Sequence, residues 1–138
     1  MRTTCKLLGL ALAVMLSQTA IGFQTGNDVS TFWEKFKTAV IKGDKNTVAT
    51  LSRFPIQMSY GKRSIRSKAE LLRRWKEVVS EQSDAIKCFA SKGPELDQSN
   101  SRRFSVACPD AAGNEVVIFQ FERGRAGWKF VGLDNINE

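Results

Sequence analysis

Cys88 and Cys108 are the residues of this 138-residue chain best suited to covalent or metal chemistry. A zinc site needs four ligands, drawn largely from cysteine and histidine, and a catalytic thiol is commonly activated by a histidine. The chain contains no histidine, so two cysteines alone meet neither requirement. A disulfide is the remaining interpretation, provided that the protein reaches an oxidising compartment. We expect no metal ion and no cofactor.

The first residues of the chain indicate export. Two cationic residues precede an uncharged apolar run at 7–16, and small residues stand before a cut after Gly22. The run is about half the length of a transmembrane helix. We therefore expect a secretory signal peptide at 1–22 and a single domain at 23–138, without a transmembrane segment, in a periplasmic or secreted location. The alternative is a permanent N-terminal anchor.

Few residues are suited to acid–base catalysis. The hydroxyl of Tyr60 could donate to a ligand oxygen, and Glu81 and Asp84 are near enough in sequence to pair for general acid–base work. The simpler interpretations are a tyrosine at the end of a strand and two exposed carboxylates in a loop. We assign no catalytic residue, and the interpretation leans away from an enzyme.

The most charged segment is 60–76, which contains seven basic residues and one acid, Glu70. Removal of the signal peptide would lower the net charge of the chain from +7 to +5. The net charge of segment 60–76 alone is +6, which is more than that of the whole mature chain. A concentrated positive field attracts anionic partners. We expect such a partner to bind at Lys62, Arg63, Arg66, Arg73 and Arg74. The simpler interpretation is a solvated helix face that keeps the protein soluble.

Helical periodicity dominates the first half of the chain. A first helix is predicted from Thr31, which has capping-box spacing with Glu34, to the stop signal Gly43. A short second helix is predicted after Asp44, which suits the N-cap. A short strand is then expected at 54–61.

A third helix is predicted at 68–79, after a second capping box formed by Ser67 and Glu70. Its apolar stripe includes Trp75 and should face the core. Arg73, Arg74 and Lys76 should therefore lie on the outward face of the helix or at its borders.

After Asp84 the period of the apolar pattern changes from 3.6 to 2. The pattern predicts an antiparallel meander of four strands, at 85–91, 102–108, 115–121 and 127–133. Opposed residues of antiparallel strands have Cα atoms about 4.5–5.5 Å apart, which suits a disulfide. We therefore expect the bond between Cys88 and Cys108 to join the first two of these strands.

This order of elements predicts an α+β fold in which three N-terminal helices pack on a curved antiparallel sheet. The segments FWEKFKTAVIKGDKNTVATLSRFPI at 32–56 and GWKFVGLDNI at 127–136 resemble the nuclear transport factor two-like, or cystatin-like cone, superfamily. The resemblance implies a cone-shaped domain whose open end can hold a small apolar ligand, in a superfamily that includes isomerases, dehydratases, binding modules and dimerisation modules.

Five aromatic residues are candidates to line such a pocket: Phe36, Tyr60, Trp75, Phe119 and Trp128. A domain of this size also needs large aromatic side chains to fill its core. A filled core is therefore the alternative to a pocket.

Three functions remain open. The first is an exported, non-enzymatic module of the cell envelope that binds a small apolar ligand or a partner protein. The second is an envelope inhibitor or immunity-type protein that acts through its basic face on an acidic protein or an anionic envelope component, and a closed cone would favour it. The third is a cone-fold isomerase or dehydratase, which a deep cone with a buried carboxylate would favour. Nucleic acid is not an expected partner, and a homodimer remains open.

Overall fold

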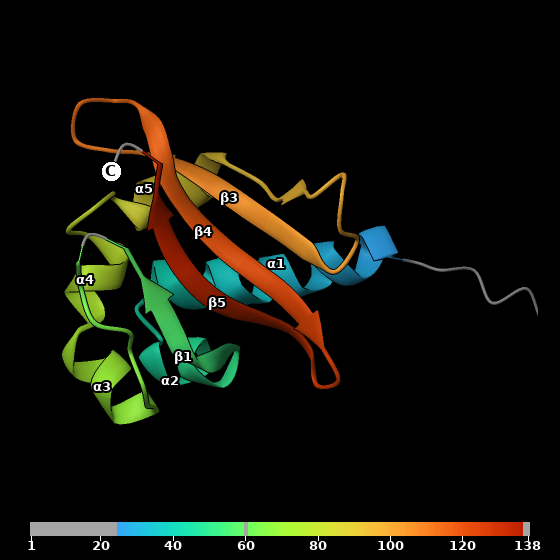
Figure 1. Cartoon of the computed structure of the whole chain (residues 1–138), viewed down its shortest axis with the longest axis horizontal. Helices are drawn as coiled ribbons and strands as arrows, with labels where there is room; N and C mark the ends of the chain where they lie inside the picture. Colours follow the sequence, from blue (N-terminus) through green and yellow to red (C-terminus); the bar gives the residue numbers. More distant parts are fainter. Residues whose placement is uncertain (1–24, 60, 137–138) are drawn as a thin grey trace, which may run out of the picture.

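The computed structural model describes residues 25–59 and 61–136, so the predicted signal peptide and Tyr60 lie outside the described residues (Figure 1). The helices are α1 (Thr25–Lys42), α2 (Lys45–Thr50), α3 (Lys68–Arg73), α4 (Trp75–Val79) and α5 (Ala85–Ser91). The strands are β1 (Ser52–Met58), β2 (Glu95–Leu96), β3 (Arg103–Pro109), β4 (Glu115–Gly124) and β5 (Gly127–Asn135).

The strands form one sheet in the order β1-β5-β4-β3-β2. Strands β2 to β5 pair antiparallel, whereas β1 pairs parallel with β5. The tight turn between β4 and β5 closes at Gly127, whose φ of 88° lies in the left-handed region that favours glycine. Figure 1 shows α1 crossing behind the sheet and α3 and α4 beside β1. The predicted α+β class is confirmed, and the sheet is mixed rather than wholly antiparallel.

The core lies between α1 and the inner face of the sheet. Alternate residues of β4 are buried, and Phe121 meets Phe36 of α1 with ring centroids 5.0 Å apart. Phe130 of β5 lies 5.3 Å from the same ring, and Phe119 lies 4.8 Å from Phe89 of α5. Interlocking aromatic rings therefore fill the space between helix and sheet.

The start of the first helix was predicted wrongly, whereas the second helix was predicted correctly. Helix α1 begins at Thr25, so the predicted start at Thr31 is wrong: Thr31 lies inside the helix. The prediction for α2 is confirmed, because the Asp44 carboxylate accepts a hydrogen bond from the backbone N–H of Thr47 at 3.1 Å. The N-cap signal thus predicted the start of α2, which directly follows the stop at Gly43, better than it predicted the start of α1.

Residues 85–91 form helix α5, so the predicted first strand of the meander is wrong. Asp84 caps the helix by accepting a hydrogen bond from the backbone N–H of Lys87 at 3.1 Å. The buried residues Ala85, Cys88 and Phe89 follow helical spacing and face the core together. The short run was therefore helical in period despite its strand-like composition.

The disulfide between Cys88 and Cys108 is present, with Cα atoms 5.7 Å apart. It joins α5 to β3, not two neighbouring strands as predicted. Because its two ends lie in different layers, the bond fixes helix α5 against strand β3 of the sheet.

The predicted helix at 68–79 is two short helices, α3 and α4, that meet at Arg74. The expected cap is present, because Ser67 Oγ accepts a hydrogen bond from the backbone N–H of Glu70 at 3.2 Å. Arg74 has backbone angles of φ −98° and ψ 21°, which interrupt the helix. No helix within residues 25–59 and 61–136 is long and apolar enough to cross a membrane.

Candidate anion-binding surface

Ile65 positions the basic segment that leads into α3. Its side chain is fully buried, and its backbone exchanges two hydrogen bonds with Ile56 of β1, at 2.8 and 2.9 Å. This short antiparallel bridge holds residues 62–66 along the outer edge of β1. Because Ile65 faces inward, the neighbouring Arg66 is left exposed, as is Arg63.

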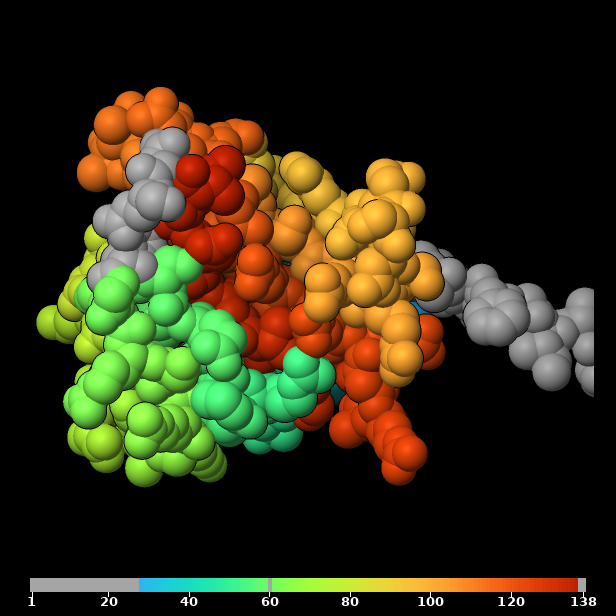
Figure 2. Space-filling model, in the orientation of Figure 1, coloured from blue at the N-terminus to red at the C-terminus, as the bar shows by residue number. Residues whose placement is uncertain are grey.

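A shallow hollow of about 530 Å³ lies where this segment meets β1. Its lining residues are Phe54, Pro55, Lys62, Arg63, Ser64 and Arg66. Three of these six residues are basic, and none is acidic. The hollow is therefore an electropositive depression open to solvent. Figure 2 shows β1 and α2, in green and teal, next to the light-green α3 region on this face of the molecule.

Lys62 lies in this hollow, but two carboxylates accompany it. Its ammonium forms an ion pair with Glu81 at 2.5 Å and lies 3.8 Å from Glu77. These carboxylates offset much of its charge. Lys62 therefore contributes less positive charge to an anion site than its place in the basic segment predicts.

Arg74 lies at the junction of α3 and α4 and is half-buried, at the border between the buried and exposed faces. Its guanidinium forms ion pairs with Glu70 at 2.9 Å and Glu77 at 2.7 Å, and it donates to the backbone carbonyl of Ser64 at 3.4 Å. The hydrogen bond to Glu77 is the main cause that raises the pKa of Arg74. This side chain joins the two helices to the basic segment, so it supports the surface instead of presenting a free charge.

The two partner carboxylates are held in their charged forms. The Arg74 guanidinium is the main cause that lowers the pKa of Glu77. The pKa of Glu70 is lowered first by the backbone N–H of Arg66, which donates at 2.9 Å, and then by Arg74. Glu70 therefore connects Arg74 to the end of the basic segment.

Arg63, Arg66 and Arg73 differ from Lys62 and Arg74. All three are exposed, and among the described residues none of their side chains forms an ion pair. A guanidinium presents a planar fork of donors that matches carboxylate, sulfate and phosphate groups. Of the five predicted anion-binding residues, Lys62, Arg63 and Arg66 thus line one hollow, Arg73 is exposed on α3, and Arg74 lies in a supporting network.

Three of the predicted pocket residues lie in the core. Phe36, Phe119 and Trp128 are each at most 3% exposed. The edge of Trp128 packs on the ring of Phe104, with centroids 5.0 Å apart. Trp75 is only partly buried, and the ammonium of Lys45 lies 5.9 Å from the centre of its ring. These four residues do not come together around one cavity.

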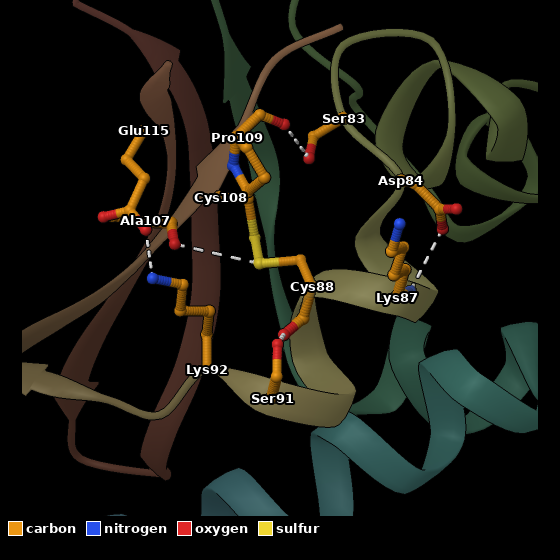
Figure 3. The surroundings of a disulfide bond; sticks show 10 residues. All are labelled: Ser83, Asp84, Lys87, Cys88, Ser91, Lys92, Ala107, Cys108, Pro109 and Glu115. Carbon is orange, nitrogen blue, oxygen red and sulfur yellow. Dashed lines mark hydrogen bonds and ion pairs between the residues drawn. A yellow bond between two sulfur atoms is a disulfide. The ribbon is translucent and has the colours of Figure 1, made fainter. Parts of the chain in front are cut away.

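A second cavity, of about 420 Å³, lies beside the disulfide. Cys88 and Pro109 contribute to its wall together with residues of the α4–α5 loop and α5. Figure 3 shows Ser83 donating to the Pro109 carbonyl and Asp84 at the start of α5. Sequence reasoning missed this cavity because it placed 85–91 in a strand.

The two carboxylates near this cavity have structural partners. Glu81 pairs with Lys62, and Asp84 caps α5. Both of them line the cavity, and each has a structural role of its own. Over the described ranges 25–59 and 61–136, no group of three or more histidine, cysteine, aspartate or glutamate residues is placed to hold a metal ion.

No family model and no curated protein matches the chain. Among solved structures, a ketosteroid isomerase-like protein from Erwinia carotovora atroseptica is similar, with 13% identity and a TM-score of 0.47 over 80% of this chain and 94% of that one. An NTF2-like protein with a cystatin-like fold from Novosphingobium aromaticivorans has 12% identity and a TM-score of 0.44 over 80% of each chain.

A Mycobacterium tuberculosis protein, whose crystal structure contains estradiol-17beta-hemisuccinate, has 12% identity and a TM-score of 0.45 over 79% of this chain and 92% of that one. Two of these three proteins are a ketosteroid isomerase-like protein and an NTF2-like protein, and the similarity is one of fold alone. The similarity concerns the arrangement of helices and strands, so the binding residues are judged on their own geometry.

Proposed function

We propose that this protein is an exported, non-enzymatic binding protein that holds an acidic protein or an anionic envelope component on its basic surface. The observation that carries the proposal is the set of exposed arginines without ion pairs: Arg63 and Arg66, which line the hollow at β1, and Arg73 on the neighbouring helix α3. Their charges are not offset by ion pairs within the described residues. They are therefore available to a partner.

The packed interior supports binding at the surface over binding inside the cone. Phe36, Phe89 and Phe121 are each 1% exposed, and the ring of Phe36 contacts both of the others in the space between α1 and the sheet. Making room for a small apolar ligand would require emptying part of this cluster, and interiors this densely packed accommodate added volume poorly.

The Arg74 network also supports the proposal. Arg74, Glu70 and Glu77 hold the α3–α4 junction, and Glu70 holds the backbone of Arg66. A segment whose backbone is held in place before binding loses less freedom when a partner arrives. The network thus fixes the backbone from which Arg66 extends.

A panel of anionic probes tests the proposal. Wild-type protein and the variant Arg63→Gln/Arg66→Gln/Arg73→Gln should be titrated with phosphatidylglycerol vesicles, a polyuronate and polyglutamate. The wild type should bind at least one probe, and the variant should bind it about tenfold or more weakly, because charge-assisted contacts contribute about 1.5–3 kcal/mol each.

The matched control is Lys35→Gln/Lys42→Gln/Lys87→Gln, which removes the same charge from exposed positions on α1 and α5. It should bind like the wild type. An equal loss in both variants would mean that net charge alone drives binding, and this result would contradict a specific surface.

A further inference from the structure

A second group of cations lies at the other end of the strands, away from the segment that stands out in the sequence. It comprises residues at the starts of β1, β3 and β5 and at the β4–β5 turn: Arg53, Arg102, Arg103, Arg123, Arg125 and Lys129. These residues are spread over most of the chain. Strand pairing brings them together, because Arg103 lies opposite Glu122, and Glu122 lies opposite Lys129.

Few carboxylates offset these charges. Glu122 is shared by Arg53, at 2.5 Å, and Arg103, at 3.3 Å. Arg123 pairs with Asp28 of α1 at 3.0 Å. Six cations are thus matched by two carboxylates.

The remaining partners in this group are neutral. Arg102 Nε donates to the backbone carbonyl of Arg123 at 3.2 Å, and Lys129 Nζ donates to the carbonyl of Thr50 at 2.7 Å. Arg125, in the turn, forms no ion pair in the described part of the chain. Asp97 and Glu95 border Arg103, and their inclusion leaves an excess of two positive charges.

Strand β1 connects this group to the hollow. Arg53 reaches Glu122 on β4, whereas the next two residues, Phe54 and Pro55, line the hollow beside Arg63. We define the basic band as Arg63, Arg66, Arg53, Lys129, Arg103 and Arg125. Figure 2 shows the β4–β5 turn, in red-orange, at the lower right and the green β1 and light-green α3 regions at the lower left of the same face of the molecule.

The length of the band can be worked out from the sheet. It crosses five adjacent backbone segments, from 62–66 through β1, β5 and β4 to β3. Neighbouring strands are about 4.8 Å apart, so the band is about 19 Å long. The Debye length at physiological salt is about 8 Å. One small anion therefore cannot interact with both ends, whereas a chain with charges along its length can.

The chemistry of the band favours a hydrophilic chain. The large exposed apolar side chains of the described residues are Ile41, Ile86, Leu96 and Ile136, and none belongs to the band. Protein interfaces are anchored mostly by Trp, Tyr and Arg side chains, and the band has no aromatic ring to accompany its arginines. Single-stranded nucleic acid is bound with exposed aromatic rings. Membrane-surface binding likewise uses inserted apolar side chains.

Resting on the proposed function, we propose that the partner is an anionic polysaccharide that lies along the basic band and contacts both ends. The guanidinium groups bind its carboxylate or sulfate groups. Once one part of the polysaccharide is bound at the hollow, binding of another part at the strand-end group is intramolecular. The second contact therefore raises the affinity for the whole polysaccharide.

Oligouronates of increasing length test this proposal. Three variants should be compared with the wild type: Arg63→Gln/Arg66→Gln at the hollow, Arg53→Gln/Arg125→Gln at the strand ends, and the control Lys35→Gln/Lys87→Gln. Duplex DNA and polyglutamate of equal charge serve as alternative partners. Neutral dextran of similar length serves as the uncharged probe.

We expect the strand-end variant to bind long chains about tenfold more weakly than the wild type, because it loses the second of two linked contacts. Its affinity for oligouronates too short to span the band should stay unchanged. The hollow variant should lose affinity at every length, and the control should match the wild type.

The outcomes separate the two proposals. If only the hollow variant loses affinity, the extended band is overturned and the proposed function stands. If neither variant differs from the lysine control, the proposed function itself is overturned. Tighter binding of polyglutamate or duplex DNA than of the oligouronate would overturn the polysaccharide as partner.

Discussion

Replacing Phe36 with Ala tests whether the interior is a filled core or a ligand pocket. Phe36 is 1% exposed, and its ring lies 5.0 Å from Phe121 and 5.3 Å from Phe130. Removing a buried aromatic ring costs about 3–5 kcal/mol, from lost transfer free energy and the cavity left behind. The centre of this range, about 4 kcal/mol, is a large share of the 5–15 kcal/mol that stabilises a typical domain.

Urea denaturation provides the assay. With a slope of about 2 kcal/mol/M, a loss of about 4 kcal/mol lowers the unfolding midpoint by about 2 M. The control is Ile41→Ala on the same helix, since Ile41 is 40% exposed and its truncation should cost within about 0.5 kcal/mol.

A pocket residue would behave differently. Truncating a side chain that lines an open cavity removes few packing contacts, so the midpoint would shift little and apolar ligands would bind better or worse. A loss below about 1 kcal/mol in Phe36→Ala, well under the usual range for a buried ring, would refute the filled core and restore the interior as a candidate site.

Three further changes test other parts of the structure. Replacing both Cys88 and Cys108 with Ser should lower the free energy of unfolding by about 3 kcal/mol, because the bond closes a loop with a sequence separation of 20; two free thiols in the native protein, by intact mass after alkylation, would contradict the bond. Trp75→Ala should cost less than Phe36→Ala, about 2 kcal/mol, because its ring is only partly buried; an equal loss in urea would mean that Trp75 belongs to the core. Arg74→Gln should make the free energy of unfolding less sensitive to acid. The pKa values of Glu70 and Glu77 are lowered in the folded protein, so the unfolded chain binds more protons than the folded one as the pH falls. The wild type therefore loses stability as the pH falls through and below about 4.3. Urea midpoints between pH 7 and pH 3 should converge at the acid end, and parallel curves would contradict the Arg74 network.

The sequence predicted the strands of the sheet best where local pattern and final contacts agree. Strands β3, β4 and β5 carry alternating apolar residues, and each buries one face against the helices. The caps at Asp44 and Ser67 also formed as expected, because capping depends only on residues three apart. Parallel pairing of β1 with β5 carries no such local signal, since it joins segments from opposite ends of the domain.

Helix α5 shows where local pattern was ambiguous. A short apolar run such as 85–91 fits a strand by composition and a helix by spacing. The buried set Ala85, Cys88 and Phe89 has helical spacing, and the N-cap at Asp84 was available as a signal in the sequence. Giving that cap the weight given to Asp44 would have predicted the helix.

The two basic groups differ in how visible they are in the sequence. The hollow group falls within one charged segment, although the supporting role of Arg74 depends on Glu70 and Glu77 at helical spacing on either side. The strand-end group is scattered along the chain. Arg53 and Arg103 meet only through Glu122, so nothing short of the strand register could have placed them together.

The salt dependence of polyuronate binding is the most direct test of the claim that the exposed arginines hold an anionic partner. Affinity should be measured across a salt series for the wild type and for Arg63→Gln/Arg66→Gln/Arg73→Gln. The account predicts that wild-type affinity falls steeply with salt, and that the variant binds more weakly with a shallower slope, by up to about one unit for each lost ionic contact. Equal affinity and equal slope in the two proteins would contradict the account.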